Sequence, residues 1–242
     1  MGDYNNALLE IRRLEFLHKN IPFVMYSNKL LCYRALGKYE DGIYDYELLN
    51  DYALKSDGRV NMQAALLYYE TQNYHQTIKK LSEKVYVTDT AIIYNRYILK
   101  AIANLQLGQY EDARNDFYSA SKFNSENYSK NISLLEELSS QKYKNPTIAK
   151  VLSIIPGLGY LYSGHKSSAI TSLLVNGILV YATYTSIKSE NFGVAALCGV
   201  FTLSFYIGNI NGASRSAERY NYMSKNDIIN QIETVNHYNL IN

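Results

Sequence analysis

The sequence predicts an all-α protein in which a helical repeat array is followed by a two-helix transmembrane hairpin, with a short re-entrant or interfacial segment at the junction. Three observations support this prediction. A tyrosine-centred motif recurs in the first half of the chain with spacings of 35, 35 and 36 residues. Two long uncharged runs, 167–187 and 191–214, lie in the second half. An apolar stretch that contains Pro156 and several glycines separates the repeats from these runs.

The distribution of charge divides the chain in two. The 242 residues carry a net charge of +2, so the composition gives no reason to expect a nucleic-acid partner. Residues 1–145 hold 18 basic and 18 acidic side chains, whereas residues 146–242 hold 6 and 4. We therefore expect a water-facing helical repeat domain with a capping helix at 1–145, and a membrane hairpin domain at 146–242.

The repeated motif places a tyrosine at the start of the second helix of each unit. Its four copies begin at Gly2, Gly37, Gln72 and Gly108. The first residue turns the chain between two helices, and the tyrosine two positions later packs on the preceding helix. Seven residues after each tyrosine, two helical turns along the same face, stands a large apolar residue. These residues are Ile11, Tyr46, Leu81 and Phe117.

Helical runs at 24–36, 60–71 and 92–107 precede the last three turns, and 127–142 forms an amphipathic capping helix. The motif and its period resemble the tetratricopeptide repeat over residues 2–123. Because the first copy lacks an upstream helix, we expect the natural chain to extend beyond Met1. The resemblance implies a concave groove, lined by the first helix of each pair, that binds a peptide or a partner helix. The groove positions are Ser27, Leu31, Arg34, Met62, Leu66, Tyr69, Ile98, Ile102 and Leu105.

The uncharged runs predict membrane spans at about 167–187 and 191–212, since roughly 20 apolar residues cross a bilayer. Asn176 lies near the middle of the first span and needs a hydrogen-bond partner, most simply in the second span. Gly208 and Gly212 form a Gly-x-x-x-Gly pair, which permits close packing within the hairpin or in a homodimer. Residues 220–242 predict a short amphipathic tail helix that lies on the bilayer or against the hairpin.

The segment 148–162 is too short to span a bilayer and is broken by proline and glycine, which favours a re-entrant or interfacial position. Its junction motif consists of Pro156, Gly157, Gly159, Tyr162 and Gly164. Together with Leu158, this motif resembles the two-transmembrane-helix domain of bacterial membrane proteins, in which Gly-Leu-Gly and aromatic-x-Gly precede a helix hairpin. The resemblance implies an architecture rather than an activity.

Basic residues flank the hairpin on its outer sides, and the connection between the spans holds one lysine. The positive-inside rule then predicts a multi-pass protein of the bacterial inner membrane with the repeats and both termini in the cytoplasm.

The sequence shows no catalytic, cofactor-binding or metal-ligating pattern. Its four histidines are scattered, and Cys32 and Cys198 lack ligand spacing. We therefore expect no cofactor, and a non-enzymatic, membrane-anchored scaffold whose repeats bind a protein partner. The alternative is a small-molecule or lipid-handling membrane protein that uses the 156–164 element.

Overall fold

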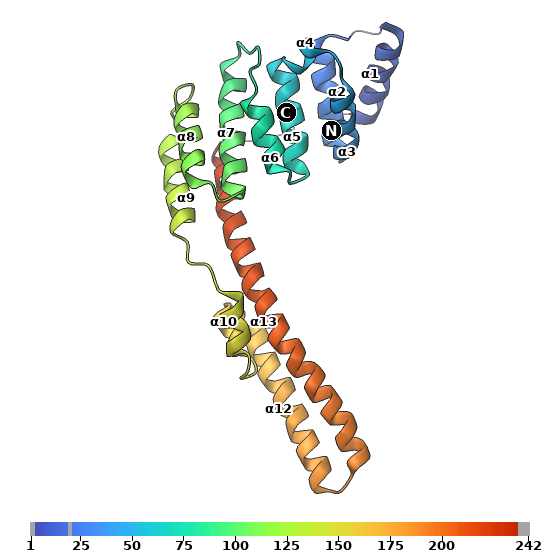
Figure 1. Ribbon diagram of the computed structural model, residues 1–242, viewed down its shortest axis with the longest axis vertical. Coiled ribbons are helices and arrows are strands. Elements are labelled where there is room, and N and C mark those ends of the chain that lie inside the picture. The colour runs from blue at the N-terminus through green and yellow to red at the C-terminus, as the bar shows by residue number, and fades with distance from the viewer. Residues whose placement is uncertain (1–2, 19–20, 237–242) are drawn as a thin grey trace. The chain divides into compact units, whose positions relative to one another are not determined.

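The structure is a computed structural model that describes residues 3–18 and 21–236. Within these ranges every regular element is a helix, apart from an isolated bridge between Asp57 and Tyr86, so the predicted all-α fold is confirmed (Figure 1). The chain divides into two compact units. The repeat unit comprises the described residues up to Ser139 together with 229–236, and the hairpin unit comprises 140–228.

The repeat unit is an array of helix pairs. Its helices are α1 (Tyr4–His18), α2 (Phe23–Ala35), α3 (Tyr39–Leu48), α4 (Tyr52–Lys55), α5 (Gly58–Glu70), α6 (Tyr74–Ser82), α7 (Thr90–Gln106), α8 (Tyr110–Ser121) and α9 (Tyr128–Ser140). The pairs α2 and α3, α5 and α6, and α7 and α8 pack within themselves, and α5 joins them by contacting α2 and α7. The repeat-like array that the sequence predicts is therefore present.

Each motif tyrosine is the first residue of a helix: α1, α3, α6 and α8 all begin at one. The turns before the last three of these helices use a left-handed residue, namely Gly37 (φ 68°), Gln72 (φ 59°) and Gly108 (φ 76°). Gln72 keeps the turn geometry without being glycine, although a side chain disfavours that backbone conformation. The same conformation at all three turns accounts for the recurrence of the motif.

The residues seven positions after the tyrosines form part of the core. Tyr46 and Phe117 are fully buried, and Ile11 and Leu81 are nearly so. Close packing also explains one small residue of the motif, because a Cβ on Gly42 would lie 2.9 Å from a methyl carbon of Leu67. Helical periodicity therefore places the repeated apolar positions inside the array.

Two of the first helices of the pairs, α5 and α7, begin at aspartate caps. Asp57 accepts hydrogen bonds from the backbone N–H groups of Arg59 and Val60, and Asp89 accepts one from that of Ala91. These bonds satisfy N–H groups that have no partner within the helix. They explain why α5 and α7 start two residues before the apolar periodicity does.

The hairpin unit contains α10 (Pro146–Leu152), α11 (Leu158–Tyr162), α12 (Lys166–Lys188) and most of α13 (Phe192–Val235). Figure 1 shows α12 and α13 side by side, joined by a short turn in which Glu190 has a φ of 56°. The predicted tail helix is the end of α13, whose residues from Ile229 onward belong to the repeat unit.

Both α12 and α13 are long and apolar enough to cross a membrane. Only 6% of the apolar window of α12 and 11% of that of α13 are buried within the protein. A core helix of a water-soluble protein would bury its apolar residues, whereas these residues face outward. The two helices therefore indicate membrane association.

Candidate functional site

The junction segment gives the hairpin unit a small packed base. Asn145 caps α10 by accepting from the N–H groups of Thr147 and Ile148, and Pro146 occupies the first turn, where a missing N–H is tolerated. Ala149 in α10 packs with Ala213 and Ala217 of α13, and Tyr160 and Tyr162 pack against these alanines. Tyr160 of this base also lines a cavity between α11, α12 and α13.

The junction glycines serve backbone geometry and close packing. Gly157 and Gly164 have left-handed φ angles of 92° and 82°. A Cβ on Gly159 would lie 2.8 Å from Ala213 Cβ and would overlap the backbone oxygen of Ala149. Tyr162 of the same motif accepts a hydrogen bond from Asn145 N–H at 3.0 Å. Pro156 lines an apolar groove with Gly157 on the α12 side of the junction.

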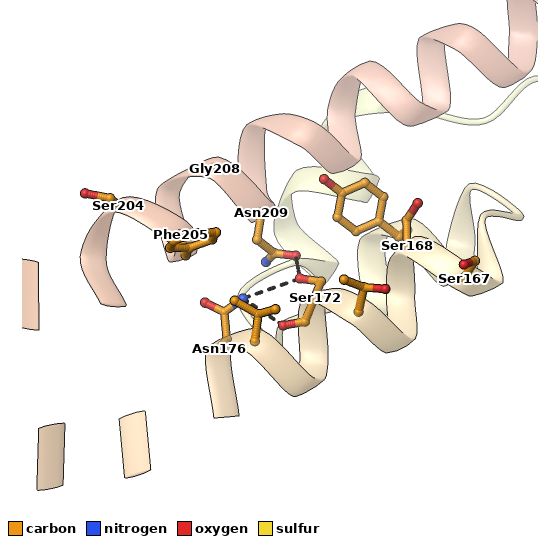
Figure 2. A pocket seen from close by; sticks show the side chains of 11 residues that line it. Ser167, Ser168, Ser172, Asn176, Ser204, Phe205, Gly208 and Asn209 are labelled. Atoms are coloured by element: carbon orange, nitrogen blue, oxygen red, sulfur yellow. Dashed lines mark hydrogen bonds between the residues drawn. The ribbon is translucent and has the colours of Figure 1, made fainter. Parts of the chain in front are cut away.

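A cavity of about 610 Å³ lies between α11, α12 and α13, and we call it the hairpin cavity (Figure 2). Its lining is mostly hydroxyl and amide side chains with a few apolar ones, and none of the described residues that line it carries a formal charge. The lining residues are Tyr160, Ser167, Ser168, Thr171, Ser172, Val175, Asn176, Ser204, Phe205, Gly208 and Asn209.

Asn209 is the central hydrogen-bonding residue of this cavity. Its Oδ1 accepts from Ser172 Oγ at 2.5 Å and from the Gly157 N–H at 3.3 Å. Its Nδ2 donates to the Ser153 carbonyl at 2.8 Å. One amide thus ties α13 to α12 and to the loop after α10, and Figure 2 shows its side chain directed at Ser172. Sequence reasoning missed this residue, although an asparagine between two glycines of an apolar span was a visible signal.

Asn176 is held less completely. Its Nδ2 donates to the Ser172 carbonyl of its own helix at 2.8 Å, and Ser172 Oγ lies 3.4 Å away. Its Oδ1 is buried and has no hydrogen-bond partner among the described residues. The structure therefore connects Asn176 to the second span only through Ser172, rather than directly.

The two glycines of the Gly-x-x-x-Gly pair have different surroundings. A Cβ on Gly208 would meet no atom within 4 Å, because this residue lines the cavity. A Cβ on Gly212 would overlap the Tyr160 hydroxyl. Gly208 therefore leaves room for the cavity, and Gly212 leaves room for Tyr160. The helices α12 and α13 approach each other elsewhere, at Thr183 and Thr202, whose hydroxyl oxygens are 3.2 Å apart.

The nine predicted groove residues lie on α2, α5 and α7 and differ widely in exposure. Leu31 and Tyr69 are half-buried, and Leu31 lines a cavity of about 410 Å³ with Arg34 and Glu70. The other members are buried: Ser27, Arg34, Met62 and Leu66 almost completely, and Ile98, Ile102 and Leu105 completely. A fully buried side chain presents no surface to a partner, so the accessible part of this face lies at α2 and α5.

The end of α13 contacts α5, α7 and α9 within the repeat unit. Tyr69 in α5 donates from its hydroxyl to Glu233 Oε1 at 2.8 Å. Tyr94 in α7 and Asn131 in α9 donate to Asn236 Oδ1 at 2.6 Å and 3.1 Å, and Asn236 Nδ2 donates back to Asn131 Oδ1 at 2.8 Å. Sequence reasoning recognised the apolar face of the tail but not these polar partners.

Burial sets the electrostatics of this contact. Desolvation raises the pKa of the Glu233 carboxyl, and the hydrogen bond from Tyr69 partly opposes that shift. Ile229 and Ile232 on the same helical face are almost completely buried. An apolar pair and a hydrogen-bonded carboxyl thus hold a helical segment on the array.

The described residues contain no group of three His, Cys, Asp or Glu side chains that could hold a metal ion. His237 lies outside the described residues. No protein-family model, curated protein or solved structure matches this chain.

Proposed function

We propose that this chain is a non-enzymatic, membrane-anchored scaffold that binds a helix of a protein partner. The repeats resemble tetratricopeptide repeats in their period and turn motif. The observation that carries the proposal is that the faces of α5 and α7 hold a helical segment, the end of α13, through Tyr69 and Tyr94. A surface that binds one amphipathic helix has the chemistry to bind another.

The partner of this scaffold binds next to that segment, at α2 and α5. Leu31 is half-buried there, and the cavity of about 410 Å³ that it lines also contains Tyr39 and Glu70. Apolar and charged groups side by side suit an amphipathic helix, whose apolar residues enter the cavity while its polar residues stay at the rim.

As part of this proposal, α12 and α13 anchor the scaffold in the bacterial inner membrane, with the chain crossing it more than once. Basic residues at Lys144, Lys150 and Arg215 flank the hairpin, which favours a cytoplasmic location for both of its outer ends. Single cysteines replacing Lys38 and Ser189, in a chain whose own cysteines are serine, test this orientation. We expect a membrane-impermeant maleimide on intact cells to label position 189 alone, and labelling of position 38 contradicts the orientation.

A pull-down from membranes tests the scaffold function with the full chain. We expect Leu31→Asp to remove a specifically bound protein, because a carboxylate in a half-buried apolar position opposes docking. Tyr44→Asp on α3 is the matched control, since Tyr44 is exposed outside the proposed face. Circular dichroism verifies that both variants fold. If folded Leu31→Asp retains every protein that the parent binds, the proposed face is not the docking site.

A further inference from the structure

We propose that the hairpin cavity binds the polar head of an uncharged, hydroxyl-bearing lipid such as diacylglycerol. This inference is independent of the scaffold function, because the cavity lies wholly within the hairpin unit. It rests on three features: the cavity's volume, the absence of charge from its lining, and an unpartnered buried acceptor. At about 610 Å³ the cavity falls within the range of small-molecule sites.

The lining selects for an uncharged ligand. Hydroxyls of Ser167, Ser168 and Thr171 and the amides of Asn176 and Asn209 can both donate and accept hydrogen bonds. A phosphate or ammonium head would enter this uncharged lining without a counter-charge, which is costly in a membrane. Lys166 does not line the cavity, and lies instead on the separate apolar groove beside Leu158.

Asn176 adds a requirement for a donor. Only 4% of this residue is exposed, and its Oδ1 has no partner among the described residues. Nδ2 already donates to the Ser172 carbonyl. Rotating the amide to exchange Nδ2 and Oδ1 would therefore place Oδ1 against that carbonyl oxygen, where two acceptors would face each other without a donor. A ligand that supplies an O–H satisfies the acceptor, whereas a hydrocarbon chain leaves it unpaired.

The geometry of the lining suits a lipid with a small head. Val175 and Phe205 add apolar surface to the hydroxyl-rich lining, so the glycerol portion of a lipid can meet polar and apolar groups together. Phe205 is labelled in Figure 2. The volume accommodates a glycerol backbone with the first part of its chains, and the remainder of the chains extends into the bilayer.

A second copy of this chain fits the site less well. Asn176 Oδ1 is buried within the hairpin, so a neighbouring helix that packs on the outer surface cannot reach it. A hydroxyl that enters the cavity beside Asn176 is small enough to do so after a modest side-chain rotation. The lipid is therefore the occupant that the buried acceptor favours.

The test uses the full chain in phosphatidylcholine nanodiscs with a photoactivatable diacylglycerol. We expect Asn176→Leu to lower specific crosslinking roughly tenfold or more, because the ligand's hydroxyl loses its acceptor. We expect this variant to remain folded, since the Ser172 carbonyl keeps its helical N–H partner. Thr185→Val is the matched control and leaves crosslinking unchanged, because that hydroxyl bonds carbonyls of its own helix outside the cavity.

A second variant tests the cavity by volume. Gly208→Leu places a side chain in open space that belongs to the cavity, so we expect it also to abolish crosslinking without unfolding the hairpin. Competition by unlabelled lipids tests the chemical class: diacylglycerol should displace the probe, and phosphatidylglycerol should not. Peptide mapping should locate the adduct within residues 160–209.

Several results overturn the proposal. Equal crosslinking in the parent, Asn176→Leu and Gly208→Leu indicates nonspecific contact with the bilayer. Displacement by phosphatidylglycerol refutes the neutral class. If Asn176→Leu instead dissociates a dimer, with crosslinking unchanged in Gly208→Leu, the site is an interface between copies. If it unfolds the hairpin while Gly208→Leu keeps the probe, Asn176 is a structural residue only.

Discussion

Alanine in place of Gly159 adds one methyl group where α11 packs against both α10 and α13. The new Cβ would lie 2.8 Å from Ala213 Cβ, whereas ordinary contacts begin at 3.4 Å. Separation along that direction therefore requires a shift of about 0.6 Å, and the overlap with the Ala149 carbonyl requires a larger one. Neither neighbour can move by rotating a side chain, since one is a backbone atom and the other a Cβ.

The magnitude follows from packing and from the hydrogen bonds that the shift disturbs. Overpacking costs about 1–3 kcal/mol. The new Cβ would also overlap Ser153 Oγ, which donates to the Ala149 carbonyl at 2.9 Å, while the Ser153 carbonyl accepts from Asn209 Nδ2 at 2.8 Å. Each weakened bond adds about 1 kcal/mol. Alanine regains up to about 1 kcal/mol of helix propensity. We expect a net destabilisation of about 2–3 kcal/mol in the hairpin unit.

Hydrogen exchange of the full chain in nanodiscs measures this effect locally, because it reports each unit separately. Gly159→Ala should speed exchange across residues 146–165 and leave the repeat unit unchanged. Gly177→Ala on α12 is the control, since a Cβ there meets no atom within 4 Å and only the helix propensity changes. If exchange in Gly159→Ala is as slow as in Gly177→Ala, close packing of α11 does not hold the base of the hairpin together.

Three further predictions concern the repeat unit. Gln72→Gly should raise its stability by about 1 kcal/mol in a urea titration, because Gln72 holds a left-handed φ of 59° that glycine adopts without strain; an unchanged midpoint argues against strain at this turn. Arg96→Met should lower the stability of the repeat unit by about 3 kcal/mol in thermal unfolding. The buried guanidinium donates to Asn61, to the Leu81 carbonyl at 2.8 Å and to the Glu83 carbonyl at 3.2 Å, and these acceptors would lose their partner. A loss below about 1 kcal/mol contradicts this account. Burial raises the folded-state pKa of Glu233, so docking of 229–235 should be stronger below that pKa and should weaken as the pH rises through it. Hydrogen exchange of these amides at pH 5 and pH 8 measures this change. Glu233→Gln should remove the pH dependence, and a parent chain whose docking does not change with pH refutes the prediction.

The elements of the array were predictable because their signals are local. A left-handed residue followed two positions later by tyrosine gave the starts of α3, α6 and α8, and the seven-residue offset placed Tyr46 and Phe117 in the core. Length and composition alone identified the two candidate spans, since crossing a bilayer is a requirement on consecutive residues. Boundaries moved by two residues where an aspartate cap extended a helix beyond its apolar pattern.

The site depended instead on contacts between residues distant in the sequence. Asn209 gains its role from Ser153 and Gly157, more than 50 positions away, and Gly212 from Tyr160. No periodicity within a helix records such pairings, because they depend on which faces meet after folding.

The sequence by itself therefore determined the helices, the repeat and the two apolar spans, because each depends on backbone preferences and on hydrophobic periodicity within a single segment. Only the tertiary structure decided that Tyr69 binds Glu233, 164 positions along the chain, and that Asn176 Oδ1 lies beside a cavity without a partner among the described residues. Hydrogen-bond partners and empty volume are properties of packed neighbours, and the neighbours are fixed only when the segments fold together.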